Sequence, residues 1–444
     1  MKLEELKEKI KSAGVIGAGG AGFPTHMKLA GGIDTILVNA AECEPLLYTD
    51  FTIMQQHMEL VASGAEAFRE ALGAKQTLVA MKLHTANALG FADGAQLGGL
   101  AAVKVLPDVY PMGDEIIMIY QALGRIVPPG QLPSSAGVVV INVETAYNIY
   151  NSIQGIPVTE KWITIGGDIE KPIVVKVPIN CSVKNVLKAA GVTVPPGHTV
   201  LDGGPAMGNI INVNIANITK KTKSLLILPS DIPAVTFKSV SAERVLKRTS
   251  SACCQCFYCT DMCPRRLIGY PLEPHKTLRA AASGKIQNPN DLVTASLCSG
   301  CGVCTLMACC QGITPSAVML EVKKNLGKNR MGYRSSEPTV PNAERDDRLV
   351  PVNRLRSRIG VAEFDKQAVF AGNLPVSQRI FSLLLLQHVG KPSIPVVSQG
   401  DMVSPGQLVA RADDGISAAL HTPVSGKVAG IDGFQIEIIA DEGK

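Results

Sequence analysis

Apolar positions in the first third of the chain alternate between two periods. Short apolar runs stand at 35–40 (TILVNA), 76–83 and 101–107, and between them apolar residues recur every three to four positions, as at 52–72. A short apolar run predicts a buried strand, and apolar residues that recur every three to four positions predict a helix. Strands that alternate with helices form parallel sheets. The pattern therefore predicts an α/β domain with a largely parallel sheet over residues 1–155.

The chain begins with one more helical period. Leu3, Leu6 and Ile10 fall on one face of residues 2–13, and lysines and glutamates occupy the rest. This pattern predicts a short amphipathic helix. Such a helix either packs on its own domain with a solvated outer face or docks on a partner.

The later segments have a different pattern of predicted elements. Residues 157–230 contain short strands and turns around one small helix, and 323–338 is a polar, basic stretch with few core-forming residues. The last eighty residues form two strand–turn–strand halves with glycine turns. We therefore expect a β domain over 156–238, a cysteine-rich domain over 239–322, a linker over 323–345 and a second β domain over 346–444.

Composition narrows the class of protein. A chain of 444 residues with 46% apolar residues exceeds one hydrophobic core, so it predicts several globular domains. A net charge of +5 is too small to indicate nucleic-acid binding. No apolar run approaches the roughly 18 residues of a membrane span, and no signal peptide is apparent. We expect a cytoplasmic protein in a reducing compartment, with no transmembrane segment.

The cysteines indicate iron–sulfur chemistry. Cys253, Cys256, Cys259 and Cys263 stand at C-x2-C-x2-C-x3-C before Pro264, and Cys298, Cys301, Cys304 and Cys309 follow at C-x2-C-x2-C-x4-C. In two-cluster ferredoxins the fourth cysteine of such a run ligates the other cluster. The spacing thus predicts two [4Fe–4S] clusters, one on Cys253, Cys256, Cys259 and Cys309 and one on Cys298, Cys301, Cys304 and Cys263.

Two other uses of these cysteines fit less well. Structural zinc usually takes two separated pairs of ligands, and disulfides need an oxidising compartment. Because the second run has one extra residue before its last cysteine, either Cys309 or Cys310 can be the eighth ligand. Cys254 would break the spacing and is expected to stay unligated.

A glycine-rich loop follows the first helix. The sequence GVIGAGGAGFPTHMKL contains Gly17, Gly19, Gly20 and Gly22 and continues with Pro24 and Thr25, which can open a helix. Glycines let the backbone approach a ligand closely, and N–H groups at a helix start attract anions. The loop matches neither a P-loop nor a Rossmann fingerprint, so it predicts only a phosphate cradle.

Polar residues cluster where the predicted strands end. They are Asn39, Glu42 and Glu44 after the first strand, Tyr110, Gly113, Asp114 and Glu115 before a helix, and Asn142, Glu144 and Thr145 after a later strand. Open α/β sheets bind ligands at this edge. The alternative is that each cluster caps the helix that follows it and binds no ligand.

These motifs together resemble a known family. GAGGAGFPTHMKL, VNAAECEP, YPMGDE and INVETAYN, in this order, are similar to the FMN-binding domain shared by the flavin subunit of respiratory complex I and the C subunit of the Rnf complex. The resemblance implies non-covalent FMN held by Gly17, Gly19, Gly20, Gly22, Lys28, Asn39, Glu42, Tyr110, Gly113 and Asn142. It also implies NADH as electron donor, with Glu44 and Glu115 in catalytic roles. The loop lacks the arginine that complex I has between its first glycines.

The β segments resemble further domains of this family. Residues 156–238 are similar to a β-grasp, soluble-ligand-binding domain, in which the turn LDGGPAMG closes a structural spacer or forms a ligand surface. The C-terminal segment resembles the barrel-sandwich fold of biotinyl and lipoyl carriers. Its hairpin DDGISAALHTPVSG has no lysine, so no covalent carrier group is expected. His421 in that hairpin is expected to be a surface or packing residue, with a metal- or heme-binding role as the alternative.

The parts together imply an electron-transfer enzyme. A flavin accepts a hydride and can release single electrons, which an iron–sulfur cluster can take. The domain order, with the barrel last, resembles the cobalamin-reductase family of propanediol-utilisation microcompartments, whereas in the Rnf protein the barrel comes first. The resemblance implies an NADH-dependent oxidoreductase with cobalamin as substrate. An adenosyltransferase and shell proteins are the implied partners, and a bacterial microcompartment is the implied location. An Rnf-type or other electron-transfer subunit and a non-enzymatic scaffold are the alternatives.

Overall fold

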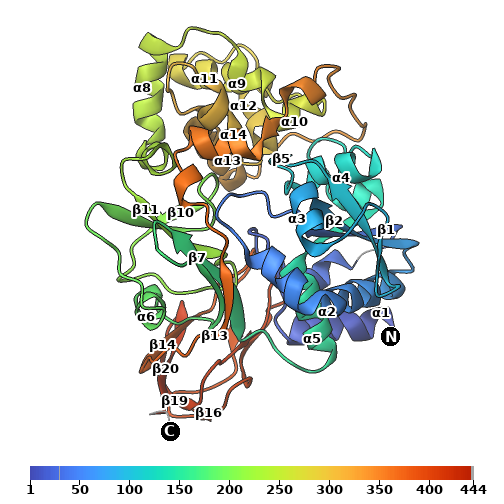
Figure 1. The fold of residues 1–444 in the computed structure, drawn as a ribbon, viewed down its shortest axis with the longest axis vertical. Coiled ribbons are helices and arrows are strands. Elements are labelled where there is room, and N and C mark those ends of the chain that lie inside the picture. The colour runs from blue at the N-terminus through green and yellow to red at the C-terminus, as the bar shows by residue number, and fades with distance from the viewer. Residues whose placement is uncertain (30, 442–444) are drawn as a thin grey trace.

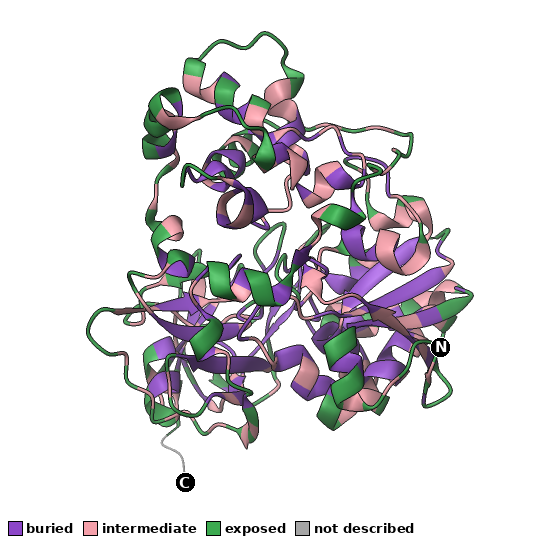
Figure 2. Ribbon diagram, turned by 45° about the horizontal axis from the view of Figure 1, so that its top comes forward, coloured by how far each residue is buried: buried purple, intermediate pink, exposed green. Residues whose placement is uncertain are grey.

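The fold comes from a computed structural model that describes residues 1–29 and 31–441. Figure 1 shows the N-terminal α/β part on one side, the cysteine-rich helices at the top and the two β parts at the lower left. Buried residues concentrate in the strands of the two large sheets, as Figure 2 shows. No helix in the described part of the chain has the length and apolar character to cross a membrane.

The N-terminal domain is built on a five-stranded sheet in the order β3–β4–β2–β1–β6. Its members are β1 (Thr35–Ala40), β2 (Gln76–Lys82), β3 (Gln96–Leu97), β4 (Ala101–Leu106) and β6 (Val138–Asn142). All pairs are parallel except β3 with β4, so the expectation of a largely parallel sheet is confirmed.

Helices cover both faces of this sheet because its side chains alternate. Ile36 and Val38 join the core on one face and Leu37 joins the core on the other. The helices of this domain are α1 (Leu3–Ser12), α2 (Thr49–Leu72), α3 (Leu83–Leu89), α4 (Glu115–Leu123) and α5 (Val143–Ile153). In α1, Leu6 and Ile10 are fully buried, so the N-terminal helix packs on its own domain.

Two of these helices approach very closely. At Gly64 of α2, a Cβ atom would lie 2.0 Å from the carbonyl oxygen of Ala146 in α5. Only glycine therefore allows this crossing. The starts of α5 and α2 also lie together, at the end of β6, because Asn142 donates to Asp50 at 2.8 Å.

The second domain is a mixed sheet in the order β10–β9–β11–β7–β8–β13. Its strands are β7 (Glu160–Gly167), β8 (Ile173–Pro178), β9 (His198–Asp202), β10 (Asn209–Ile211), β11 (Ser224–Pro229) and β13 (Val369–Asn373). The helix α6 (Val183–Ala189) connects β8 to β9. The strands β7 and β11 are parallel at the centre, and β7 with β8 and β9 with β11 are antiparallel.

The cysteine-rich part is helical. After α7 (Pro233–Thr236), its helices are α8 (Ala242–Ala252), α9 (Tyr258–Asp261), α10 (Pro264–Leu267), α11 (Pro274–Ser283), α12 (Asn290–Val293) and α13 (Pro315–Lys328). Tyr270, Leu297 and Met319 share one core with residues of α4 and β6. The helical part is therefore packed directly on the N-terminal domain.

The C-terminal part contains two small sheets, β14–β20–β19–β16 and β15–β17–β18. Their strands are β14 (Ile380–Leu384), β15 (Ile394–Pro395), β16 (Met402–Val403), β17 (Leu408–Arg411), β18 (Leu420–His421), β19 (Gly426–Ile431) and β20 (Gln435–Ala440). Phe381 and Ile438 share a core with Ile163 of β7. The two β parts thus form one packed unit.

The chain between the helical part and the small sheets joins three domains. The strand β12 (Val350–Pro351) pairs with β5 (Val109–Tyr110), and α14 (Val352–Arg358) follows. Then β13 pairs in parallel with β8 of the second sheet. The predicted boundary between the linker and the C-terminal domain at residue 346 stays a prediction. The strands that follow it, β12 and β13, pair with strands of the first and second domains.

Candidate functional site

The glycine loop is a short hairpin with open backbone at its tip. Gly17 N donates to Phe23 O at 2.8 Å, and Ala18 N donates to Thr145 Oγ1 of α5 at 3.0 Å. Gly20 has φ of +130°, and a Cβ atom there would meet no other atom within 4 Å. The tip is therefore exposed and open to a ligand, whereas its base is fixed to α5.

The segment after the loop differs from expectation. Residues Thr25–Lys28 form a single 3-10 turn and not the start of a longer helix. Lys28 Nζ donates to Val140 O of β6 at 2.7 Å, and burial lowers its pKa, an effect that the Glu115 carboxylate opposes. The predicted helix thus starts where expected, but it is only one 3-10 turn long. Lys28 is directed to the middle of β6.

Asn39 connects two of the predicted polar clusters. Its side chain donates to Gly113 O at 2.9 Å and accepts from Ala41 N at 3.1 Å. A Cβ atom on Gly113 would lie 2.9 Å from Cys43 Sγ and 3.1 Å from Ala41 O, so a side chain there would crowd the end of β1. The structure therefore brings the end of β1 and the segment after β5 together, as expected for a ligand-binding edge.

Glu42 has structural partners at the start of α2. It accepts from Thr49 N at 3.0 Å and Asp50 N at 3.1 Å, which caps the N-terminus of this helix. Burial raises the pKa of Glu42 to about 7, and the Asp50 charge adds to the shift. A role of Glu42 in cofactor binding stays a prediction.

Glu44 is held by the glycine turn of the second domain. It accepts from Ala206 N at 2.9 Å and from Met207 N at 2.7 Å, and burial raises its pKa. A Cβ atom on Gly204 would lie 2.3 Å from Glu44 Cδ. The turn LDGGPAMG therefore docks the second domain on the strand end of the first. Glu115, in contrast, is exposed at the start of α4.

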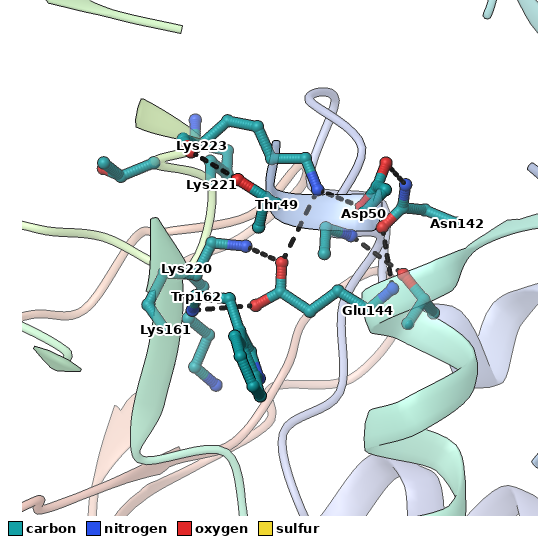
Figure 3. Close-up of polar contacts among 12 residues, drawn as sticks. Thr49, Asp50, Asn142, Glu144, Lys161, Trp162, Lys220, Lys221 and Lys223 are labelled. Atoms are coloured by element: carbon teal, nitrogen blue, oxygen red, sulfur yellow. Dashed lines mark hydrogen bonds and ion pairs between the residues drawn. The ribbon is translucent and has the colours of Figure 1, made fainter. Parts of the chain in front are cut away.

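A buried ion network lies where the first two domains meet (Figure 3). Asn142 caps α5 by accepting from Glu144 N at 3.0 Å, and it donates to Asp50 Oδ2 at 2.8 Å. Lys223 pairs with Asp50, and Lys161 of β7 pairs with Glu144. Lys161 and Glu144 are each only 1% exposed. This network positions the start of α5 beside the glycine loop.

Sequence reasoning missed the lysines of this network. Lys161 belongs to the strand EKWITIGG. The pattern of polar and apolar residues in this strand does not indicate which of its faces another domain covers. The lysine-rich segment KKTK at 220–223 carries no local sign of burial either. In the structure, Lys220 is buried and donates to Gly14 O at 2.7 Å and to Ala419 O at 2.8 Å. Burial lowers the pKa of Lys220 to about 7.

The C-terminal part, including the hairpin DDGISAALHTPVSG, also reaches the glycine loop. Val389 N donates to Gly22 O at 3.0 Å, and a Cβ atom on Gly14 would lie 2.3 Å from Ala419 O. His421 is 6% exposed, and burial lowers its pKa to about 4. Of the two expected roles, packing is therefore confirmed and a surface position is wrong. A carrier domain would expose this hairpin, whereas here it is docked.

The first set of four predicted cysteine ligands borders a small cavity. Cys253, Cys256, Cys259 and Cys309 line it together with Phe257, His275 and Ile313. Burial raises the pKa of Cys259 to about 12, with further contributions from Cys309, Cys256 and Cys253. The structure therefore gathers these four thiols, which come from both cysteine runs.

The second set is deeper in the protein. Cys263, Cys301 and Cys304 are buried and Cys298 is half-buried. Burial raises the pKa of Cys304, with contributions from Cys298, Cys301 and Cys263. Gly300 N donates to Cys298 Sγ at 3.4 Å, the kind of N–H···S contact that tunes cluster potentials. All eight thiols are free, so none of them is committed to a disulfide, and the assignment of two clusters stays a prediction.

Two further cysteines accompany the first set. Cys310 Sγ lies 3.8 Å from Cys254 Sγ and 3.9 Å from Cys256 Sγ, and all three residues are exposed. Three sulfurs this close could hold a single ion, whereas a four-iron cluster spreads its ligands farther apart. The choice between Cys309 and Cys310 as the eighth ligand stays open.

The second set lies against the N-terminal domain. Tyr110 Oη donates to Cys301 O at 2.7 Å. Arg265, two residues after Cys263, forms a two-pronged ion pair with Asp114 at 2.9 and 2.8 Å. The strand-end residues and the buried thiols are therefore joined without an intervening domain.

Comparison with known protein families agrees with this arrangement. Residues 10–151 match the Nuo51 FMN-binding domain, residues 252–314 a 4Fe-4S dicluster domain, and residues 370–441 the RnfC barrel sandwich hybrid domain. The fold and the site thus define a flavin- and iron–sulfur-dependent oxidoreductase.

Full-length relatives make the assignment narrower. The chain is 38% identical to cobalamin reductase PduS of Citrobacter freundii, over 98% of this chain and 96% of the relative. It is 36% identical to cobalamin reductase PduS of Salmonella typhimurium, over 99% and 97%. The chain belongs to the cobalamin reductase PduS family. It is also 32% identical to the C subunit of an ion-translocating oxidoreductase complex from Serratia proteamaculans, over 64% of this chain and 40% of that protein.

Proposed function

We propose that this protein is an NADH-dependent reductase that reduces cobalamin, as cob(III)alamin or cob(II)alamin, to reactivate a B12-dependent pathway. One observation carries the proposal: a single chain packs a flavin-type strand edge directly on buried cluster thiols, through Tyr110 with Cys301 and Asp114 with Arg265. Identity over nearly the whole length to proteins named cobalamin reductase supports the choice of acceptor.

The residues divide into three groups by task. The open backbone at Gly19 and Gly20 suits a phosphate. Gly17 and Gly22 at the base of the loop would complete the FMN site together with Asn39, Tyr110, Gly113, Asn142, Lys28 and Glu42. Glu44 and Glu115 would position the nicotinamide. Cys253, Cys256, Cys259 and Cys309 would hold one [4Fe–4S] cluster, and Cys263, Cys298, Cys301 and Cys304 the other.

The electron balance follows from the cofactors. When bound, FMN takes a hydride, and the clusters pass single electrons. Each NADH supplies two electrons and releases one proton in total, so two cobalt centres are each reduced by one electron. The protein contributes by orienting the nicotinamide, excluding water and fixing the separation of the redox groups.

The finer assignments belong to the same proposal. The central parallel pair β7–β11 with α6 across the sheet supports a β-grasp fold for residues 156–238. The domain limits are those given by the sequence, with the linker at 323–345. An adenosyltransferase would receive the reduced corrinoid, and the protein would act in the cytoplasm, inside a microcompartment whose shell proteins are further partners.

A second function has two matches in its favour. The match to the C subunit of an ion-translocating complex is joined by a match to the barrel sandwich hybrid domain. An electron-transfer subunit of this type would pass electrons from NADH to a protein acceptor. Such a subunit needs that partner for turnover, whereas a cobalamin reductase does not.

Anaerobic reconstitution tests the proposal. We expect about eight irons and one FMN per chain, because two four-iron clusters are predicted. NADH should bleach the flavin spectrum, and cob(II)alamin should form from hydroxocobalamin without another protein. A colourless protein that contains zinc in place of iron would refute the assignment. Flavin bleaching without cob(II)alamin formation would favour the electron-transfer subunit.

A further inference from the structure

The two cysteine sets differ in how far they lie from solvent. The set of Cys263, Cys298, Cys301 and Cys304 is packed against the N-terminal domain, through the contacts of Tyr110 and Arg265. In the other set, Cys256 is exposed and its neighbours Cys254 and Cys310 are exposed as well. Electrons that enter from the flavin edge would therefore leave from the set that includes Cys256.

A cleft of about 330 Å³ opens beside this outer set. Phe257 and His275 line both the cleft and the cysteine cavity. Their rings meet edge to face with centroids 4.6 Å apart. This pair is thus the wall between the cleft and the thiols, and a ligand in the cleft would lie one side chain away from the cluster site.

The aromatic wall is held in place and remains accessible. Phe257 is 44% exposed and adopts φ of +63°, a conformation rare for a large side chain. His275 Nδ1 lies 2.7 Å from Thr260 Oγ1, and His275 N donates to the same hydroxyl at 3.2 Å. The cleft therefore presents a fixed apolar surface on its inner side.

The outer side of the cleft is polar but nearly balanced in charge. Arg348 Nη1 lies 3.2 Å from Asp261 Oδ2 and also pairs with Glu344. In all, three carboxylates and two guanidinium groups line the cleft. An anionic nucleotide or an acidic carrier protein would require an excess of positive charge, which this lining does not provide.

We infer that this cleft binds the amide-bearing edge of a corrinoid. A corrin carries neutral amide side chains around its rim, each a donor and an acceptor, and its faces are apolar. The cleft offers the complementary set: carboxylates, guanidinium groups, the Asn342 amide and an aromatic wall. The slight excess of carboxylates suits the positive charge of aquacob(III)alamin. The inference rests on the proposed function and specifies where its substrate binds.

A substitution that fills the cleft tests this inference on the full-length, reconstituted protein. Asn342 lines the cleft, and its exposed neighbour Ala343 does not. In Asn342→Trp the Kd for hydroxocobalamin, measured by equilibrium dialysis, should rise about tenfold or more. Ala343→Trp is the matched control and should leave the Kd unchanged. Flavin bleaching by NADH and the cluster EPR signals should persist in both variants.

A second variant covers the case in which Asn342→Trp does not fold. Glu344→Lys places an added cation at the exposed rim and should weaken binding of the cationic corrinoid in the same assay. Unchanged binding in the folded variants, or no binding to the wild type, would overturn the cleft assignment. Failure of the proposed function gives another result, in which wild-type protein with reduced clusters yields no cob(II)alamin. If wild type and Asn342→Trp reduce cobalamin equally fast, only the cleft assignment fails.

Discussion

The pair Lys161–Glu144 shows how single residues hold the first two domains together. Both side chains are almost fully buried, and burial lowers the pKa of Lys161 while Glu144 opposes this shift. Glu144→Gln would leave a buried ammonium without its carboxylate. We expect a loss of about 3–5 kcal/mol in the free energy of unfolding, measured by chemical denaturation.

Two further variants separate charge from packing. Glu144→Gln combined with Lys161→Met should recover most of the loss, because no buried charge is then left unpaired. Glu243→Gln breaks the exposed pair with Lys247 and should cost less than about 1 kcal/mol. An equal loss in the buried and exposed variants would contradict the interpretation.

His421 predicts a dependence of stability on pH. Its pKa is about 4 in the folded protein, mainly because of burial, against 6.5 in the unfolded chain. Below pH 6.5 the unfolded chain binds a proton that the folded protein does not, so stability is complete above pH 6.5 and falls toward pH 4. At pH 5 the cost is about 2 kcal/mol, at about 1.4 kcal/mol per pH unit.

The substitution His421→Gln removes this proton. Thermal unfolding of wild type and variant at pH 7 and pH 5 measures the effect. We expect the difference between the two pH values to shrink by about 2 kcal/mol in the variant. An identical difference in both proteins would show that His421 is protonated in the folded state or is exposed.

Site residues can be predicted from the sequence where the members of a group are close neighbours along the chain. The cysteine runs and the polar clusters at 39–44 and 110–115 can be read from neighbouring positions, and the structure brings each group together. The partners of Glu44 and Lys161 could not be predicted, because they lie in another domain. A backbone turn at 206–207 carries no sequence sign that it will receive a carboxylate from residue 44.

Among the elements, the crossing of α2 and α5 depends on one small residue. A methyl group on Gly64 would overlap the Ala146 carbonyl, so Gly64→Ala must push the helices apart. We expect a loss of about 1–3 kcal/mol, the usual cost of overpacking. Ser63→Ala in the same helix is the control and should change stability by less than about 0.5 kcal/mol. Thermal unfolding of the two variants measures the difference.

The stability of Gly64→Ala can also contradict this interpretation of the helix pair. If Gly64→Ala were as stable as wild type, the closeness of α2 and α5 would not be required by the fold. A stabilised variant would indicate that the helix propensity gained from alanine outweighs the contact.

The regular elements of the first domain can be predicted from periodicity, whereas the connecting segments cannot. The strand at 35–40 has the predicted limits, and the helix predicted at 52–72 begins at Thr49 because Glu42 caps it. The helix expected after Pro24 is a single turn. The strand β13 could not be assigned from sequence, since its partner β8 lies about two hundred residues earlier and no local pattern identifies it.

At the scale of the whole molecule, the order of the two cysteine sets predicts unequal effects of removing either one. In Cys256→Ala, NADH should still reduce the flavin and the cluster on the buried set. In Cys301→Ala, NADH should reduce the flavin only, and the remaining cluster should be reduced by dithionite but not by NADH. EPR spectroscopy of each variant measures this, because a cluster that loses a ligand loses its signal.

The opposite pattern of reduction in the two variants would contradict this order of electron transfer. If NADH reduced the outer cluster in Cys301→Ala as fast as in wild type, the buried set would not lie on the electron path. The overall class of protein followed from the sequence because flavin and cluster motifs are contiguous. The order of the clusters did not, since it depends on which cysteines contact the N-terminal domain.

The barrel-like C-terminal part docks on the glycine loop through Val389 with Gly22 and Ala419 with Gly14. Its contacts are thus with residues near the beginning of the chain, although its own residues come at the end. A gene rearrangement that moved this part ahead of the first helix would keep it beside the same loop. A circular permutation of this kind would give the barrel-first order that the resemblance to the Rnf protein implies.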